Sequence, residues 1–179
     1  MSATDSGQRV LLILPCMPWL KYRSGFEKGG LWRSVLKRID AWRAGTDVYA
    51  IDCISLKSTG KMIGLWSPYS DNEVFEEILE NNLDSYPSWG KFKTHPERQE
   101  ELREQVDQKL SQIASRYGHV IAFVNVRAYY ECLKSLSRKY QITVLPRDIS
   151  WRTPRGITNS QFDQLRLELQ RRLPVPDRY

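Results

Sequence analysis

Four short runs of consecutive apolar residues alternate along the chain with longer segments whose apolar residues recur every three or four positions. A continuous apolar run is typical of a strand buried on both faces, and the wider spacing is typical of one face of a helix. The predicted strands cover residues 9–14, 47–54, 119–124 and 141–145. The predicted helices cover residues 31–42, 94–117, 127–140 and about 160–173.

Strands that alternate with helices pair in parallel through right-handed crossovers, so the pattern predicts a layered α/β fold. We expect a single domain over residues 9–179, with a mostly parallel central sheet flanked by helices. Residues 1–8 are expected to form a disordered N-terminus, and a basic helical extension is expected from about residue 147. A chain of 179 residues is long enough to bury the core of one such domain.

The pattern is least regular between Ser55 and Lys93, where glycine and proline interrupt it. Only the apolar residues at 74, 75, 78 and 79 suggest a short helix there. Long irregular segments in compact domains are usually functional or mobile. The next helix is preceded by Thr94-His95-Pro96-Glu97, which is interpreted as a capping box.

Ligands of parallel α/β sheets bind beyond the carboxyl ends of the strands. This rule selects three segments of the chain as candidate ligand sites. They are the loop 15–30, the loop 55–71 and the turn 125–127.

The formal net charge of +6 indicates either attraction to a polyanion or simple solubility. Arginines are concentrated from residue 147 onward, whereas acidic residues gather at 73–80. The planar guanidinium group can bind a phosphate through two hydrogen bonds, so these arginines are candidate nucleic-acid contacts. The candidates in this region are Arg147, Arg152, Arg155, Arg171 and Arg172.

Several classes of protein are disfavoured by what the sequence lacks. No apolar run approaches the roughly 18 residues that cross a bilayer, and no secretory signal is visible at the start. Three widely spaced cysteines and two histidines predict neither a disulfide framework nor a metal cluster. The glycine-rich nucleotide-binding motifs are also missing. We therefore expect a cytoplasmic protein without a cofactor or bound metal.

Cys16 directly follows the first predicted strand, where a sheet presents side chains to a ligand. A helix N-terminus or a nearby cation such as Lys21 would favour its thiolate form and make it nucleophilic. The alternative is a small apolar residue that completes a core strand, which is a common use of cysteine.

The segment that starts at Pro15-Cys16 resembles the signature of the archaeosine synthase-like domain, which reads Pro-Cys, three residues, Lys-Pro-Tyr, two residues and Ser. Pro15, Cys16 and Tyr22 match in register. Lys21 stands one position away, where that family has proline, Ser24 comes one residue early, and the expected following histidine is missing. The order of elements is also similar, including Tyr-Gly-His-Val-Ile at residues 117–121.

The resemblance implies an α/β fold like that of uracil-DNA glycosylases and a role in 7-deazaguanine modification of nucleic acids. The expected substrate is 7-cyano-7-deazaguanine within DNA or RNA, whose nitrile becomes an amide or an amidine. A Cys16 thiolate would add to the electrophilic nitrile carbon, and water or an amine would resolve the thioimide. Cys16, Lys21 and Asp52 are the candidate catalytic residues. The implied partners are nucleic acid and other enzymes of a 7-deazaguanine pathway.

Asp52, near the end of the second strand, could hydrogen-bond a purine-like edge or transfer protons, or it could be a turn residue. Four aromatic residues in the two expected ligand loops could sandwich a base, although such residues also anchor loops onto a core. The candidate substrate-binding residues are Pro15, Trp19, Tyr22, Ser24, Trp66, Tyr69 and Asn125.

Two short segments, 89–93 and 151–155, mix aromatic and basic residues in a pattern suited to stacking and phosphate contact. They add Lys91 and Lys93 to the candidate nucleic-acid contacts. Three functions remain open: a nitrile-modifying enzyme, a non-catalytic module that binds a modified base, and a glycosylase-like enzyme suggested by the fold alone.

Overall fold

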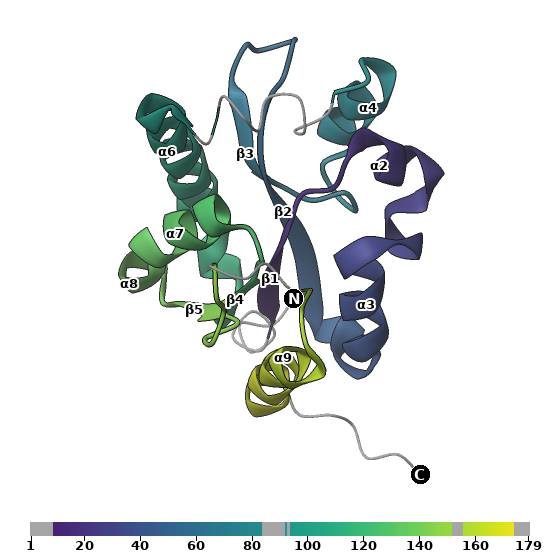
Figure 1. Cartoon of the computed structure of the whole chain (residues 1–179), viewed down its shortest axis with the longest axis vertical. Helices are drawn as coiled ribbons and strands as arrows, with labels where there is room; N and C mark the ends of the chain where they lie inside the picture. Colours follow the sequence, from purple (N-terminus) through teal and green to yellow (C-terminus); the bar gives the residue numbers. More distant parts are fainter. Residues whose placement is uncertain (1–8, 84–91, 93, 152–155, 174–179) are drawn as a thin grey trace.

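The computed structural model describes residues 9–83, 92, 94–151 and 156–173, and within these residues five strands form one sheet. The strands are β1 (Val10–Pro15), β2 (Thr46–Ser55), β3 (Met62–Trp66), β4 (His119–Phe123) and β5 (Ile142–Leu145). Their order across the sheet is β3-β2-β1-β4-β5. Strands β2, β1, β4 and β5 are parallel, and β3 runs antiparallel to β2 (Figure 1).

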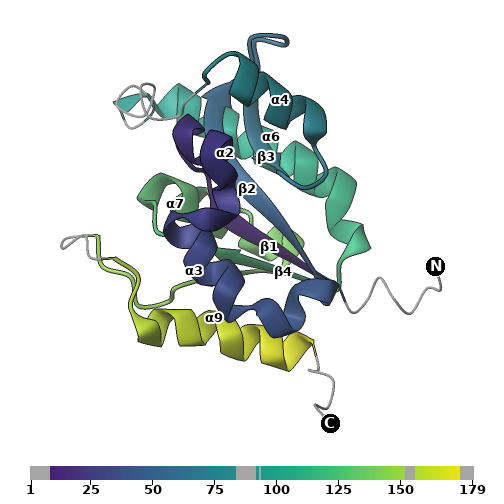
Figure 2. The ribbon, with the colours of Figure 1, turned by 90° about the vertical axis from the view of Figure 1, so that its right-hand side faces the viewer.

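Helices cover both faces of this sheet, as Figures 1 and 2 show. One face carries α2 (Trp19–Gly25), α3 (Gly30–Arg38), α4 (Asn72–Glu80) and α9 (Asn159–Arg172). The other carries α6 (Pro96–Ile113), α7 (Arg127–Ser135) and α8 (Ser137–Tyr140). Short 3-10 turns occupy 26–28, 40–45 and 114–116. The predicted α/β class, with a mostly parallel sheet between helices, is confirmed.

The central strand β1 shows why its sequence is apolar without interruption. Leu11 and Ile13 pack toward α6 and α7, whereas Leu12 and Leu14 pack toward the helices of the opposite face. All four side chains are fully buried. A parallel strand covered by helices on both faces needs apolar residues at every position, which is the pattern that identified it.

The strand order reverses at β1, and this reversal positions the candidate site. The chain passes from β1 through α3 to β2 on one side, and later returns through α6 to β4 on the other side of β1. Connections that leave neighbouring strands in opposite directions open a crevice at their carboxyl ends, where ligands of such sheets bind. In this sheet, the rule points to the carboxyl ends of β1 and β4.

Strand β3 was not predicted, because residues 55–71 were interpreted as a loop. Gly64 in its middle has φ +76°, and a methyl group there would lie 2.6 Å from Cβ of Gln105 on α6. Glycine therefore allows α6 to approach the strand closely. Since β3 runs back along β2, Trp66 pairs with Ala50 inside the sheet instead of lying in a loop at the carboxyl edge.

Helix boundaries differ from the predicted ones at several places. The predicted helix 31–42 ends at Arg38 and is followed by the 3-10 turn 40–45. The expected loop 15–30 contains α2, and the expected helix 127–140 is divided at Leu136 into α7 and α8. The predicted capping box at 94–97 is wrong, since the N-cap of α6 is His95, whose side chain makes no capping hydrogen bond. A reciprocal box does begin α9, where Thr158 accepts from the Gln161 backbone at 3.2 Å and Gln161 accepts in return at 3.0 Å.

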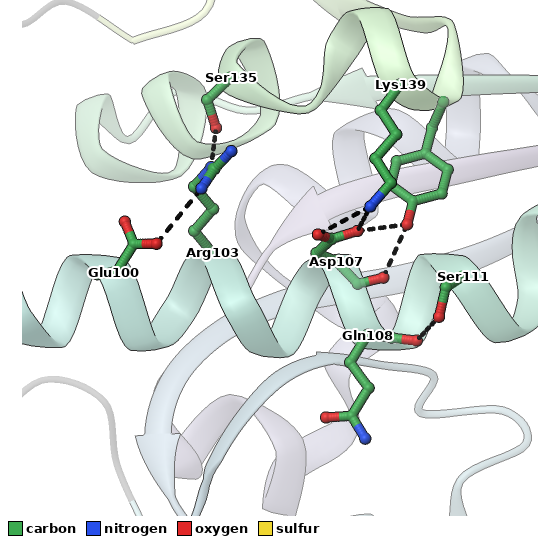
Figure 3. A network of polar contacts seen from close by, with 8 residues as sticks. Glu100, Arg103, Asp107, Gln108, Ser111, Ser135 and Lys139 are labelled. Atoms are coloured by element: carbon green, nitrogen blue, oxygen red, sulfur yellow. Dashed lines mark hydrogen bonds and ion pairs between the residues drawn. The ribbon is translucent and has the colours of Figure 1, made fainter.

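A polar network fastens α7 and α8 to α6 (Figure 3). Arg103 donates to Ser135 at 3.1 Å, and Lys139 donates to the Asp107 carboxylate at 2.9 Å. The Tyr140 hydroxyl donates to the backbone carbonyl of Asp107 at 3.0 Å. These contacts fix α7 against the sheet, and α7 carries a residue of the candidate site described below.

Within the described residues, no helix combines the length and the apolar composition needed to cross a membrane. The prediction of a disordered N-terminus concerns residues 1–8, which lie outside the described part of the chain.

Candidate active site at the carboxyl edge of the sheet

Cys16 directly follows β1, at the carboxyl edge of the sheet where the strand order reverses. Its backbone N–H donates to the carbonyl of Ile51 at 3.0 Å, so the sheet pairing with β2 continues one residue past the strand. Its side chain is half-buried and packs against the core on the α6–α7 face. The residue predicted to be the nucleophile is thus held by a rigid strand at the edge where ligands bind.

The hydroxyl of Tyr129 connects Cys16 with β2. Tyr129 lies in the first turn of α7, is 1% exposed, and places its hydroxyl oxygen 3.1 Å from the Cys16 sulfur. The same oxygen accepts a hydrogen bond from the backbone N–H of Cys53 at 3.3 Å. Because a helix that follows a parallel strand begins at the carboxyl edge, its first turn naturally faces this site.

A bulge in β2 explains why two of its backbone N–H groups donate hydrogen bonds to side chains. The register with β3 shifts between Asp52 and Ser55, so Cys53 and Ile54 lie outside the regular ladder. The N–H of Cys53 is bonded by Tyr129, and the N–H of Ile54 donates to the Asp52 carboxylate at 3.0 Å. Bulges recur next to active sites because they redirect side chains, and this one places the buried Asp52, 2% exposed, at the carboxyl edge.

Two tyrosine hydroxyls at the site remain protonated. Burial raises the pKa of Tyr129 well above its ordinary value, and the nearby charges of Cys16 and Asp52 raise it further. Burial likewise raises the pKa of Tyr22, with Asp52 and Cys16 contributing next. The Tyr22 hydroxyl accepts the N–H of Met17 at 3.0 Å. Both hydroxyls can therefore donate a proton in hydrogen bonds to an anion beside them.

The other two cysteines are less exposed than Cys16. Burial raises the pKa of the Cys53 thiol to about 11 and that of Cys132 to about 12. Both are buried, so each remains a neutral thiol at neutral pH. All three cysteines belong to the described residues, and Cys16 alone is partly exposed.

Arg98 brings a cation to the carboxyl end of β2. Its guanidinium donates to the carbonyl of Cys53 and to the hydroxyl of Ser55, both at 3.4 Å. Its Nε is buried and has no hydrogen-bond partner among the described residues. Sequence reasoning missed Arg98 because its helix carries no motif. It also missed Tyr129, although the rule that predicted the 125–127 turn extends to the helix that follows.

The structure brings two of the three predicted catalytic residues together. Cys16 lies beside Asp52 on the neighbouring strand, because Pro15 pairs with Ile51 and the Cys16 N–H donates to the Ile51 carbonyl. Lys21 is exposed on α2, and its ammonium lies against Gly29 at the start of α3, 3.0 Å from the position a Cβ there would take.

Three smaller predicted residues lie at the carboxyl edge of the sheet or within α2. Pro15 is the buried last residue of β1, and Asn125 is exposed two residues after the end of β4. The exposed Ser24 donates to the carbonyl of Leu20 at 2.6 Å, within α2. Asn125 is therefore the predicted substrate-binding side chain that lies open to solvent at the carboxyl edge.

The predicted aromatic residues pack mainly into the core. Tyr22 and Trp66 have ring centroids 5.3 Å apart, and Trp66 is only 1% exposed. Trp19 donates its indole N–H to the carbonyl of Leu79 at 3.2 Å, which anchors α2 to α4. Tyr69 is exposed and donates to Glu27 at 2.7 Å. Because Trp66 is fully buried, a base could stack on it only after the surrounding residues moved.

Three predicted nucleic-acid contacts converge on one buried carboxylate. Glu168 of α9 is 5% exposed and forms ion pairs with Arg147 at 3.2 Å, Arg171 at 3.3 Å and Arg172 at 3.7 Å. Arg172 lies near the amino end of the sheet, since burial and then its charge lower the pKa of His119, the first residue of β4. The other candidates, Lys91, Lys93, Arg152 and Arg155, lie outside the described residues.

Within the described residues, no group of histidine, cysteine or acidic side chains is arranged to hold a metal ion. Comparison of the chain with protein-family models, curated proteins and solved structures gives no match. The functional assignment therefore depends on the residues and geometry of the Cys16 site.

Proposed function

We propose that the chain modifies the nitrile of a 7-cyano-7-deazaguanine base carried in DNA or RNA, with Cys16 as the nucleophile. The observation that supports this proposal best is the contact of 3.1 Å between the Cys16 sulfur and the Tyr129 hydroxyl. A partly exposed thiol and a protonated hydroxyl in contact at the carboxyl edge of a parallel sheet, beside Asp52, support this reading. This pair has the chemistry that addition to a nitrile requires.

The first step is addition of the thiolate to the nitrile carbon. The sulfur–carbon bond forms as one carbon–nitrogen π bond breaks, and the nitrogen takes up a proton, which gives a covalent thioimidate. The Tyr129 hydroxyl is positioned to hydrogen-bond the Cys16 thiolate before the attack, and it can supply a proton as negative charge moves to nitrogen.

The second step is attack of water on the thioimidate carbon. A carbon–oxygen bond forms to give a tetrahedral intermediate, and the carbon–sulfur bond then breaks, which releases the amide and regenerates the Cys16 thiolate. The proton lost by the attacking water replaces the proton that Tyr129 gave to the nitrogen. The sum of both steps is addition of one water molecule to the nitrile, which yields the amide. Asp52 is the candidate group for accepting the proton of this water, because it is a carboxylate at the same edge of the sheet.

Amidine formation would need an amine in place of water. Lys21 stands one position away from its place in the archaeosine synthase-like signature, and the histidine of that signature is missing, which favours the water-dependent product. The proposed reaction is accordingly hydration of the nitrile to the amide, as a one-cysteine enzyme without a cofactor.

Mass spectrometry of nucleosides tests this proposal directly. DNA and RNA that carry 7-cyano-7-deazaguanine are incubated with the protein, digested and compared with untreated samples. The expected result is a gain of one water on the modified nucleoside, lost in Cys16→Ser but kept in the control Cys132→Ala. Binding without any mass change would favour a recognition module, and release of the free base would favour a glycosylase.

A further inference from the structure

A pocket beside the outer edge of β5 differs from the other pockets in the charge of its lining. It has a volume of about 400 Å³ and is lined by Tyr130, Lys134, Ile142, Thr143, Val144 and Arg147. This lining contains two cations and two hydroxyl groups and no carboxylate. Three other pockets formed by described residues each include an aspartate, namely Asp71, Asp47 or Asp163.

Arg147 is held in place by two side chains of α9. Its backbone N–H donates to the side-chain oxygen of Gln164 at 2.8 Å, and its guanidinium donates to Glu168 at 3.2 Å. Glu168 is 5% exposed, whereas Arg147 is 58% exposed. A guanidinium has five N–H donors, so the buried carboxylate orients the group and leaves donors directed outward.

The local charge around this pocket remains positive. Glu168 is shared with Arg171 and Arg172, so one carboxylate faces three guanidinium groups. Lys134 on the α7 wall is exposed and forms no ion pair within the described part of the chain. Asp148, next to Arg147, accepts a hydrogen bond from Gln164, so four basic side chains are opposed by two carboxylates in this region. The remaining excess of positive charge attracts an anion.

Hydroxyl and backbone donors complete the lining. The Tyr130 hydroxyl donates its proton to the carbonyl of Pro146 at 3.1 Å, so it closes the pocket wall beside Arg147 and does not add a donor. Thr143 lies on β5, the outermost strand of the sheet, whose outer backbone groups have no strand partner among the described residues. The Thr143 hydroxyl, the backbone amides and the two cations together form a donor set of the kind that binds phosphate.

We propose that this pocket binds a phosphate group. The inference goes beyond the proposed function, because it concerns a second site and requires no turnover. The two sites share α7, since Tyr129 faces Cys16 and the next residue, Tyr130, lines the pocket. Strands β1 and β5 are separated by β4, so the pocket lies about 10 Å to the side of the Cys16 strand. The phosphate belongs either to a nucleic-acid strand that passes the Cys16 site or to a free phosphomonoester.

Binding of an unmodified, fluorescently labelled single-stranded DNA oligonucleotide tests the proposal. The variants are Arg147→Gln and Lys134→Gln, and the matched control is Arg166→Gln, an arginine of α9 that is 54% exposed and also paired to a carboxylate. Each pocket variant is expected to weaken binding about tenfold and to lower the slope of log K against log salt by about one. The control is expected to bind within about twofold of the unchanged protein.

Competition separates the two sources of phosphate. Displacement of the oligonucleotide by a nucleoside monophosphate or by inorganic phosphate supports a phosphomonoester site. Displacement only by a second oligonucleotide without a terminal phosphate supports contact with the nucleic-acid backbone. The proposal is overturned if both pocket variants bind like Arg166→Gln. Lys134→Gln leaves Glu168 and the core untouched, so it tests the pocket even if Arg147→Gln unfolds, and an unmodified oligonucleotide keeps the result independent of nitrile chemistry.

Discussion

Replacement of Tyr129 by phenylalanine tests the central geometry of the candidate active site. The substitution keeps the buried ring, which packs against Phe92 with centroids 6.4 Å apart, and removes only the hydroxyl oxygen. That oxygen lies 3.1 Å from the Cys16 sulfur and accepts the N–H of Cys53 at 3.3 Å. The variant therefore loses a contact to the nucleophile and an acceptor at the β2 bulge at the same time.

The expected loss of stability follows from the Cys53 N–H. This group lies outside the regular ladder and is buried, so removal of its acceptor leaves an unsatisfied donor, which costs about 1–3 kcal/mol. For a chain of this length, such a loss lowers the melting temperature by about 2–12 °C. Tyr117→Phe is the control, because its hydroxyl donates to Asp47 at 2.8 Å near the amino end of β2, away from Cys16.

The expected chemical effect is slower alkylation of Cys16. A charge-assisted hydrogen bond contributes about 1.5 kcal/mol or more, so its loss reduces the thiolate fraction about tenfold. Iodoacetamide, followed by peptide mass spectrometry, measures this rate. Native protein should react at Cys16 alone, because burial raises the thiol pKa of Cys53 to about 11 and that of Cys132 to about 12. Equal Cys16 rates in Tyr129→Phe and Tyr117→Phe would refute the role given to Tyr129.

Two further predictions concern the elements that hold the site. Gly64→Ala should destabilise the protein by about 2–4 kcal/mol, because it places a methyl group 2.6 Å from Gln105 at a positive φ. Gly60→Ala, at φ +67° with open space around it, should lose only the part of this free energy that comes from the unfavourable backbone conformation. Equal melting temperatures of the two variants would contradict this prediction. Asp107→Asn should lower stability at neutral pH by about 0.5 kcal/mol, since hydrogen bonds from Tyr140 and Lys139 lower the pKa of Asp107 below 3.8. A carboxylate whose pKa is lowered by folding stabilises the folded state at pH values above its ordinary pKa. This contribution is lost as the pH falls through the pKa of the folded state, so urea titrations should show the free energies of unfolding of the two proteins converging below about pH 4.

The parallel strands were predictable because burial on both faces leaves a signal in consecutive residues. Val10 to Leu14 are all apolar for this reason, and the segments at β2, β4 and β5 follow the same logic. Strand β3 gives no such signal. It has five residues with glycine in the middle, and that glycine is explained by the approach of α6, a contact between positions 64 and 105 that no local pattern contains.

The candidate site was predictable only in part, for a similar reason. The position of Cys16 follows from the end of a recognisable strand, and Asp52 follows from the end of the next. Tyr129 is 113 residues from Cys16 in sequence, so their contact depends on the fold and not on spacing. The pairing of Glu168 with Arg171 and Arg172 could have been predicted from their helical spacing of three and four residues, whereas its pairing with Arg147 could not.

The β2 bulge connects the irregular part of the sheet to the proposed chemistry. Because the bulge removes Cys53 and Ile54 from the ladder, Tyr129 and Asp52 must satisfy two backbone N–H groups in addition to any role in the reaction. A loss of turnover on deleting either side chain therefore does not by itself identify a chemical role. Asp52→Asn is more informative than Asp52→Ala, because the amide oxygen can still accept the N–H of Ile54 while the negative charge beside both tyrosine hydroxyls is removed. A stable Asp52→Asn protein that binds nucleic acid but has lost turnover would isolate the charge as the contribution of Asp52.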